Sequence, residues 1–228
     1  MCYFPGGKKR IGKEIATAIF NSTLEESEFT PKGYTEPFLG MASVYQYIPE
    51  LFNEYELEYL GGDRNPYIIK LWQKLQTGWK PPKSCSREEY YNYKDKNSVS
   101  AKALFCGFAC AYRGDFRSSY FAKNNVERQA HDCQVTAKRI KNVTLSTGDY
   151  TQFSDCYQNI IYCDPPYRDT QNPYKINEIK NKEFDYDSFI EWCVRMSEDN
   201  IIFISEYTKP CPQAELILNL GKEKLFKI

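Results

Sequence analysis

The sequence predicts an α/β fold with a mostly parallel sheet. Short apolar stretches of strand length alternate with segments whose apolar residues repeat at helical spacing, and this alternation fails only over residues 78–142. The length of 228 residues suits one ordinary domain with room for a small insertion. We therefore expect residues 1–77 and 143–228 to form one packed domain, with residues 78–142 inserted into it.

The first 77 residues predict an N-terminal helix followed by a β-α-β-α unit. The helix pattern is an apolar stripe entered from a glycine-rich, basic loop. Asn65 can cap a helix and Pro66 suits its first position. The expected elements are a helix over 8–20, a strand over 34–40 that ends in a tight turn, a helix over 43–48, a strand over 57–60 and a helix that starts at 66.

The remaining residues predict the insertion and then a return to alternation. Residues 78–100 are polar and punctuated by proline, and Ser86 with Glu89 forms a possible capping box for a short helix. The elements expected after the insertion are a strand over 143–146, a buried strand over 160–163, a loop to about 182, a helix over 187–197, a buried strand over 201–205 and a hairpin of 214–220 with 224–228.

Composition excludes several classes of protein. Hydrophobic residues make up 42% and charged residues 26% of the chain, which argues against a disordered, collagen-like or coiled-coil protein. No apolar run approaches the roughly 20 residues that cross a bilayer, so we expect no membrane segment. The nine cysteines are odd in number, contain no CxxC and follow nothing that resembles a signal peptide. We expect reduced thiols in a cytoplasm.

Charge is balanced overall but segregated along the chain. Thirty basic residues cancel thirty acidic ones, so no global field attracts a polyanion. Residues 101–145 hold eight basic and three acidic residues, whereas residues 21–80 hold five and nine. A surface that binds nucleic acid would therefore be local, and the charge is segregated along the chain.

Acidic residues and tight turns follow several predicted strands. They are residues 36–40, Asp63, Asp149 and residues 164–167. Ligands of open α/β sheets bind outside the carboxyl ends of the strands, near the point where the strand order reverses. We therefore expect these groups to share one site.

The turn Asp164-Pro165-Pro166-Tyr167 is the most specific of these signals. Two prolines remove two N–H donors and leave an edge of hydrogen-bond acceptors. A carboxylate and a main-chain carbonyl can accept both hydrogens of an exocyclic amino group, while the tyrosine ring stacks on the base. Such a pair would favour the pyramidal amine that attacks an electrophilic methyl group.

A small-residue turn over residues 36–43 suits the close approach of a nucleoside cofactor. Asp63 follows Gly40 by 23 positions and ends the next strand. This is the spacing at which a nucleotide-binding unit places an acid on ribose hydroxyls.

Six motifs, in their order along the chain, resemble the Dam-type DNA adenine methyltransferases. They are Phe4-Pro5-Gly6-Gly7-Lys8, Glu36-Pro37-Phe38-Leu39-Gly40, Gly62-Asp63-Arg64-Asn65, Gly148-Asp149-Tyr150, Asp164-Pro165-Pro166-Tyr167 and Ser205-Glu206-Tyr207. The resemblance spans residues 4–207. It implies a Rossmann-like class I methyltransferase fold, with a mixed sheet, helices on both faces and a small helical target-recognition insertion over 78–142.

The resemblance also implies an activity and a setting. The enzyme would transfer a methyl group from S-adenosylmethionine to the N6 amine of an adenine flipped out of double-stranded DNA at a specific site. We expect a monomer or weak dimer in the cytoplasm, in a bacterial, phage or viral context. A cytosine N4 or RNA adenine methyltransferase would use the same turn, because the amines are alike. A non-catalytic DNA-binding relative is a further alternative.

Site residues follow from the resemblance and from the chemistry of the side chains. The catalytic set would be Asp164, Pro165, Pro166 and Tyr167. The cofactor-binding set would be Phe4, Gly6, Gly7, Lys8, Glu36, Pro37, Phe38, Gly40, Asp63, Asp149, Tyr150 and Asp164. Lys8 can pair with the carboxylate of the cofactor, and an aromatic face such as that of Phe4 can favour its sulfonium.

Candidate DNA contacts lie mainly in the insertion, where aromatic residues interleave with arginine. Arginine can contact guanine edges or phosphates, and aromatic rings can wedge or stack beside a flipped base. The expected set is Lys9, Arg113, Arg117, Tyr120, Lys138 and Arg139, with Arg113 and Arg117 foremost. Lys138 and Arg139 could equally be the solvated end of a helix.

The first cofactor turn departs from the family pattern. Ala42 stands where the family has a second glycine, and Met41 replaces another small residue. Alanine allows the same close approach if its φ stays negative, so we expect reduced tolerance and not loss of cofactor binding.

No metal site is expected from the sequence. Methyl transfer needs no metal ion, and Cys106 and Cys110 lack a Cys or His pair at ligand spacing. His131 is the only histidine and falls in a polar helical stretch, where a surface position is expected.

Overall fold

A computed structural model describes residues 7–168 and 184–228. Its centre is a seven-stranded sheet in the order β3-β2-β1-β4-β5-β7-β6. The strands are β1 (Gly33–Glu36), β2 (Glu58–Asp63), β3 (Thr144–Thr147), β4 (Asn159–Cys163), β5 (Ile201–Glu206), β6 (Glu215–Leu220) and β7 (Glu223–Lys227). Strands β1 to β5 pair in parallel, and β7 is antiparallel to both β5 and β6. The predicted mostly parallel sheet and the closing hairpin are confirmed.

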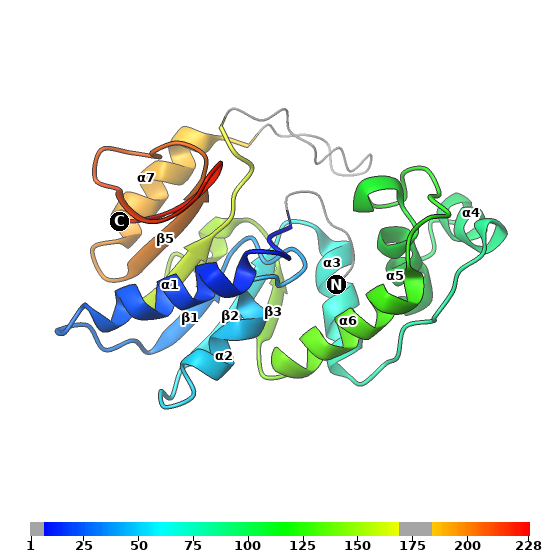
Figure 1. Cartoon of the computed structure of the whole chain (residues 1–228), viewed down its shortest axis with the longest axis horizontal. Helices are drawn as coiled ribbons and strands as arrows, with labels where there is room; N and C mark the ends of the chain where they lie inside the picture. Colours follow the sequence, from blue (N-terminus) through cyan, green and yellow to red (C-terminus); the bar gives the residue numbers. More distant parts are fainter. Residues whose placement is uncertain (1–6, 169–183) are drawn as a thin grey trace.

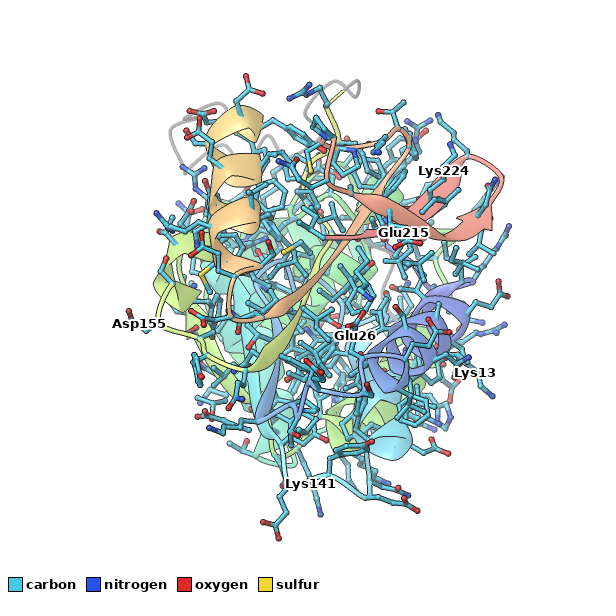
Figure 2. The ribbon with its side chains drawn as sticks, turned by 90° about the vertical axis from the view of Figure 1, so that its left-hand side faces the viewer. Lys13, Glu26, Lys141, Asp155, Glu215 and Lys224 are labelled. Carbon is cyan, nitrogen blue, oxygen red and sulfur yellow. The ribbon has the colours of Figure 1, made fainter. Side chains whose placement is uncertain are left out.

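Helices cover both faces of this sheet (Figure 1). In β4, Ile160 and Tyr162 join the hydrophobic cluster under α1 (Gly12–Leu24), α2 (Ile48–Leu51) and α3 (Pro66–Gln76). Ile161 and Cys163 join the cluster under α7 (Tyr186–Met196). This alternation follows from the two-residue period of a strand. Figure 2 shows α7 and α1 on opposite sides of the sheet, with charged side chains such as Lys13 at the periphery.

The structure has helices where the sequence predicts them, but the residues at which they begin agree less well. They are α1 (Gly12–Leu24), η1 (Tyr45–Tyr47), α2 (Ile48–Leu51), α3 (Pro66–Gln76), α4 (Arg87–Asp95), α5 (Ala101–Ala109), η2 (Tyr112–Gly114), α6 (Val126–Arg139), η3 (Tyr150–Phe153) and α7 (Tyr186–Met196). The predicted caps of α3 and α4 are present: the Asn65 side chain accepts from the Tyr67 N–H, and Ser86 with Glu89 forms a capping box.

Two helices differ from their predicted bounds. The helix expected from residue 8 begins at Gly12, because the Lys8 carbonyl accepts from the N–H groups of Ile11 and Gly12 and closes a turn first. The helix expected over 43–48 is a 3-10 turn that passes into a short α2, in which Pro49 occupies the first turn. Proline fits there because the N–H groups of a first turn have no helical partner.

Residues 78–142 contribute α4, α5, η2 and α6. Helix α4 packs on α5, α5 packs on α3, and α6 lies against α3 and η1. Figure 1 shows α4 and α5 at the end of the molecule opposite α7. One hydrophobic cluster runs from the sheet through α3 into α5 and α6, so the inserted helices share the core of the domain. Within residues 7–168 and 184–228, no helix is long and apolar enough to cross a membrane.

Candidate active site

The polar groups predicted at strand ends meet at the carboxyl edge of the sheet. Strand β1 ends at Glu36 and lies between β2, which ends at Asp63, and β4, which leads into Asp164. The chain moves to one side of β1 to form β2 and to the other side to form β4. This is the reversal of strand order at which open α/β sheets bind ligands, and the strand ends that carry the predicted polar groups meet there.

Three side chains form a network with Asp164. The Lys8 ammonium donates to both carboxylate oxygens, at 2.8 Å to Oδ1 and 3.0 Å to Oδ2. The Tyr167 hydroxyl donates to Asp164 Oδ1 at 3.0 Å and to the carboxylate of Glu223. Lys8 Nζ also lies 3.6 Å from Glu223 Oε1 and 4.9 Å from the centre of the Tyr167 ring. The network joins the N-terminal loop, the turn after β4 and the start of β7.

Burial strengthens the electrostatic interactions between the charged side chains of this network. The side chains of Lys8, Asp164 and Glu223 are 7%, 21% and 17% exposed. Burial opposes protonation of Lys8, but the carboxylates of Asp164 and Glu223 outweigh it and raise the pKa of the lysine. Burial raises the pKa of Glu223, and Lys8 and Tyr167 oppose that shift. The two carboxylates are therefore held close together by the lysine between them.

Glu36 is an additional buried acid beside the network. It is 2% exposed, and the Tyr34 hydroxyl donates to its Oε1 at 2.8 Å. Burial raises the pKa of Glu36 well above its usual value, the Tyr34 hydrogen bond opposes the shift, and the charge of Asp164 adds to it. These effects together favour the protonated form of Glu36. The residue that follows it, Pro37, is also buried.

Asp63 organises the turn that follows β1. Its Oδ2 accepts from the Gly40 N–H at 2.9 Å, and its Oδ1 accepts from the Asn65 N–H at 2.7 Å. Trp72 of α3 donates from Nε1 to the Gly40 carbonyl at 2.9 Å. Burial raises the pKa of Asp63 to about 6, against the effect of its two backbone hydrogen bonds. The predicted cofactor turn and the predicted acid are in direct contact.

The backbone of this turn corrects one expectation. Ala42 has a φ of +52°, so the negative φ on which easy accommodation of alanine was conditional is absent, and Gly40 has a φ of +47°. The turn reverses tightly, with the Ala42 N–H donating to the Leu39 carbonyl at 2.8 Å, and this closure imposes the left-handed conformation. The conformation costs a residue other than glycine roughly 1–2 kcal/mol. Met41 is 2% exposed and packs in the core below the turn.

An aromatic cluster flanks the turn on its other side. Phe38 stacks on Tyr150, with ring centres 6.0 Å apart at 28°, and meets Phe189 edge-on at 5.5 Å. Tyr150 is 8% exposed. Asp149 is exposed and caps η3 by accepting from the Thr151 N–H at 3.4 Å. Two predicted cofactor residues, Phe38 and Tyr150, are thus neighbours in space.

Two acidic residues of the edge were not among the predicted site residues. Glu223 contacts Lys8 and Tyr167, as described above. Glu206, 2% exposed, ends β5 and accepts from the N–H groups of Tyr207, at 2.7 Å, and Arg168, at 3.2 Å. Because β7 is antiparallel to β5, its first residue lies at the carboxyl edge. That rule, applied to the predicted hairpin, is the signal that could have identified Glu223.

The arginines of the insertion differ from each other in their surroundings. The Arg117 guanidinium donates to the Ser98 carbonyl and lies over the rings of Phe116, at 4.8 Å, and Tyr67, at 5.6 Å. It therefore ties the loop before α5 to the core of the insertion. Arg113 is exposed, with its guanidinium 5.3 Å from the centre of the Tyr112 ring.

The other predicted DNA contacts lie apart from one another. Tyr120 is partly buried and donates from its hydroxyl to the Cys85 carbonyl at 3.1 Å. Lys9 pairs with Asp132 of α6 at 2.9 Å and is half exposed. Lys138 and Arg139 are exposed in the last turn of α6, which leads to the beginning of β3 and so to the opposite edge of the sheet from Asp164. These assignments stay predictions.

The structure leaves two of the predicted cofactor residues undescribed. Phe4 and Gly6 lie outside the described residues, as does most of the loop expected before residue 182. Gly7 is the first described residue and is exposed. Pro165 is buried and Pro166 partly buried, which fixes the backbone between Asp164 and Tyr167.

The similarity of this chain to the solved structures named here is distant. Two solved structures of the rRNA methyltransferase AviRa from Streptomyces viridochromogenes align with 94% of this chain and 83% of their own, at 11% and 12% identity. Their TM-score of 0.46 is too low to support a conclusion. The comparison with curated proteins finds no match.

A family model resolves the assignment. The model of the D12 class N6 adenine-specific DNA methyltransferases matches residues 4–217, most of the sequence. The matched range includes every motif on which the resemblance rests, and the sheet has the Rossmann-like order expected of a methyltransferase, extended by the antiparallel β7 and β6. The chain belongs to the D12 class of N6 adenine-specific DNA methyltransferases.

Proposed function

We propose that this adenine DNA methyltransferase uses S-adenosylmethionine and modifies N6 of an adenine flipped out of double-stranded DNA at a specific sequence. The observation that supports this most directly is the Asp164 carboxylate. It follows β4 at the carboxyl edge, and both of its oxygens accept hydrogen bonds from Lys8. The proline-rich turn keeps the Asp164 carboxylate and the Pro165 carbonyl on one short, rigid segment.

The residues at the edge have the chemistry that the cofactor requires. Asp63 lies beneath the Gly40 turn, where a carboxylate can accept from ribose hydroxyls, and the cluster of Phe38 and Tyr150 offers aromatic surface beside that turn. Lys8 would hold the carboxylate of the cofactor. When bound, S-adenosylmethionine supplies a methyl group on a sulfonium sulfur, whose departure as a thioether is favourable.

Lys8 occupies the place that the proposed mechanism gives to the adenine amine. Its N–H groups donate to Asp164 and its ammonium lies over the Tyr167 ring. An amine that binds there must displace the lysine. Lys8 would release Asp164 by turning to the cofactor carboxylate, so that cofactor binding prepares the acceptor for the base.

The chemical role of Asp164 follows from its acceptor capacity. The carboxylate and the Pro165 carbonyl accept the two N6 hydrogens, which favours a pyramidal nitrogen with an available lone pair. The bound cofactor would supply the methyl carbon that this lone pair attacks, and its sulfur would leave with the electrons of the carbon–sulfur bond. The proton that the methylated nitrogen loses can pass to Asp164, which already accepts a hydrogen bond from it. Catalysis then rests mainly on positioning.

The insertion would recognise the target sequence. It holds an excess of basic residues over 101–145, and Arg113 is exposed on it. In this proposal residues 78–142 provide the recognition surface, while residues 1–77 and 143–228 perform the chemistry. Specificity would come from base-edge contacts, and affinity from phosphate contacts.

The reaction is tested with purified protein, unmodified genomic DNA and methyl-labelled S-adenosylmethionine, followed by mass spectrometry of the nucleosides. We expect labelled N6-methyladenine. Labelled N4-methylcytosine would change the substrate base, and label found only on added RNA would refute the choice of DNA. Binding of cofactor and DNA without any label would identify a non-catalytic relative.

Asp164→Ala tests the mechanism. We expect at least a roughly 100-fold loss of methyl transfer from a protein that still folds, with a lower melting temperature because the buried Lys8 ammonium loses a charged partner. Asp155→Ala removes an exposed carboxylate at the opposite edge of the sheet and is expected to keep full activity (Figure 2). Methylation by Asp164→Ala at the rate of Asp155→Ala would refute the role of Asp164.

A further inference from the structure

Three cysteines of the insertion bring their sulfur atoms together. The Sγ atoms of Cys85, Cys106 and Cys110 all lie within 4.8 Å of one another. Cys106 and Cys110 are one helical turn apart, at the end of α5, so they share a face of that helix. Cys85 comes from the segment before α4, 21 positions earlier in the sequence than Cys106. The three thiols thus come together from two separate elements.

Backbone hydrogen bonds fix the position of each of these elements. Tyr120 donates from its hydroxyl to the Cys85 carbonyl at 3.1 Å, and the Phe121 N–H donates to the Cys110 carbonyl at 2.8 Å. Asn124 donates to the carbonyls on both sides of Cys110, at 2.8 Å to Ala109 and 3.0 Å to Ala111. These hydrogen bonds therefore hold in place the backbone that carries the three sulfur atoms.

The arrangement differs from that of the other cysteines. A buried thiol that packs among apolar side chains behaves as a small apolar group, and Cys211 lies in such a cluster with Ala214 and Phe226. Within residues 7–168 and 184–228, the three cysteines of the insertion form the one group in which three metal-ligating side chains converge. Exposures of 5%, 0% and 0% for Cys85, Cys106 and Cys110 leave Cys85 nearest to solvent.

The distances suit a thiophilic metal ion. With Zn–S bonds of about 2.3 Å, sulfur ligands of a tetrahedral ion are about 3.8 Å apart, which requires each pair here to close by no more than about 1 Å. Thiolates prefer Zn²⁺ and Cu⁺ over harder ions. Cys85 directly precedes Ser86, the N-cap of α4, so the positive end of that helix favours its thiolate.

We propose that Cys85, Cys106 and Cys110 bind one zinc ion, with a fourth ligand from solvent on the side of Cys85. The ion would fasten the segment before α4 to the end of α5 and so stabilise the insertion. Binding of a metal ion to the folded state alone adds to folding stability. The site lies in the insertion and takes no part in methyl transfer.

Metal analysis of the full chain tests the proposal. The protein is purified without an affinity tag, stripped with chelator under reducing conditions, and given one equivalent of Zn²⁺ before gel filtration. We expect one zinc per chain in the unmodified protein and in Cys133→Ala, which removes another fully buried thiol of the insertion. We expect no retained zinc in Cys106→Ala or Cys110→Ala. Equal zinc contents in all four proteins, or none in the unmodified protein, would overturn the site.

A cobalt titration of the unmodified chain keeps the test valid if the variants fail to fold. Thiolate-to-cobalt charge-transfer absorption grows with the number of sulfur ligands, so saturation at one Co²⁺ with three thiolates per ion is expected. Zinc should then displace the cobalt and abolish the absorption. A cobalt spectrum without thiolate bands, or a disulfide among the three cysteines in the protein as isolated under reducing conditions, would overturn the proposal.

Discussion

The carboxyl edge of the sheet and the inserted helices hold their polar groups in different ways. At the edge, partners come from distant parts of the chain: Lys8 and Asp164 are 156 residues apart. In the insertion, partners are closer in sequence, such as Lys102 with Glu89 at 13 residues and Arg117 with Ser98 at 19. The edge therefore forms only when the whole sheet is folded. The insertion combines such local contacts with longer ones from α6, where Asp132 pairs with Lys9 and Thr136 donates to Gln46.

Trp72 joins the two regions, and its removal gives the largest expected effect on stability. Its side chain is fully buried in α3, which contacts both β2 and α5, and its Nε1 donates to Gly40. We expect Trp72→Ala to lower the free energy of unfolding by about 3–5 kcal/mol and to weaken cofactor binding. Urea denaturation and calorimetric titration measure the two effects.

Trp79→Ala is the control for the change at Trp72, because this tryptophan is only partly buried. A smaller loss of stability is expected, with cofactor binding unchanged. If both variants bind cofactor as the unmodified protein does, Trp72 does not hold the turn in its working conformation.

Arg117→Ala and Arg113→Ala compare an arginine that supports the insertion with one that is exposed to solvent. Removing Arg117 leaves the Ser98 carbonyl without its charged donor and uncovers Phe116, so a loss of about 1–3 kcal/mol in unfolding free energy is expected. Arg113→Ala is expected to leave stability within about 0.5 kcal/mol and to weaken DNA binding.

Chemical denaturation and DNA titration at two salt concentrations measure the arginine variants. The salt dependence of DNA affinity should fall in Arg113→Ala if this residue contacts a phosphate. Equal losses of stability in the two variants would contradict the distinction drawn between them.

Cofactor binding at the carboxyl edge is expected to depend on pH through Asp63. Asp63 has a raised pKa of about 6 in the folded protein, so it takes up a proton as the pH falls through that value. The folded state binds this proton more tightly than the unfolded chain, so the contribution of Asp63 to stability falls as pH rises from about 4 to about 6. A protonated carboxyl loses acceptor capacity for ribose hydroxyls. Cofactor affinity should therefore fall about tenfold between pH 7 and pH 5.

Asp63→Asn is the control for this pH effect. It should bind cofactor more weakly at neutral pH and show no step near pH 6 in calorimetric titrations. A step of the same size in the variant would assign the titration to another group of the edge, such as Glu223.

Ala42→Gly gives the smallest expected effect. Glycine removes a strain of roughly 1–2 kcal/mol at a φ of +52°, and its greater freedom in the unfolded chain costs about 0.5–1 kcal/mol. We expect a gain of up to about 1 kcal/mol in unfolding free energy, measured by thermal and urea denaturation. Gly40→Ala, also at a positive φ, should lose stability. A loss in Ala42→Gly would show that the alanine methyl group packs favourably enough to outweigh the strain.

The sequence predicted the strands well because their signals are local. The apolar run over 160–163, which ends at a proline-rich turn, predicts a buried strand, and the structure places β4 there. The caps at Asn65 and Ser86 were also predictable, since capping needs only residues two or three positions away. Helix starts were less predictable, because the apolar stripe does not show that a turn closed on the Lys8 carbonyl precedes α1.

The site was predictable in its motifs and less so in its contacts. Asp63, Gly40 and Asp164 carry recognisable patterns, but no pattern shows that Lys8 binds Asp164 or that Arg117 binds the Ser98 carbonyl. Glu223 has no motif, and its place at the edge follows from the antiparallel direction of β7. The convergence of Cys85 on the cysteines of α5 likewise depends on tertiary packing and not on spacing.

The insertion of β7 between β5 and β6 has a consequence for folding during synthesis. Strand β6 leaves the ribosome before β7, yet it pairs only with β7, so it has no partner in the sheet until residues 223–227 follow it. Until then β5 exposes an open edge, which is a template for pairing with another chain. A nascent chain stalled before residue 223 would hold nearly every motif of the enzyme and still be prone to aggregate.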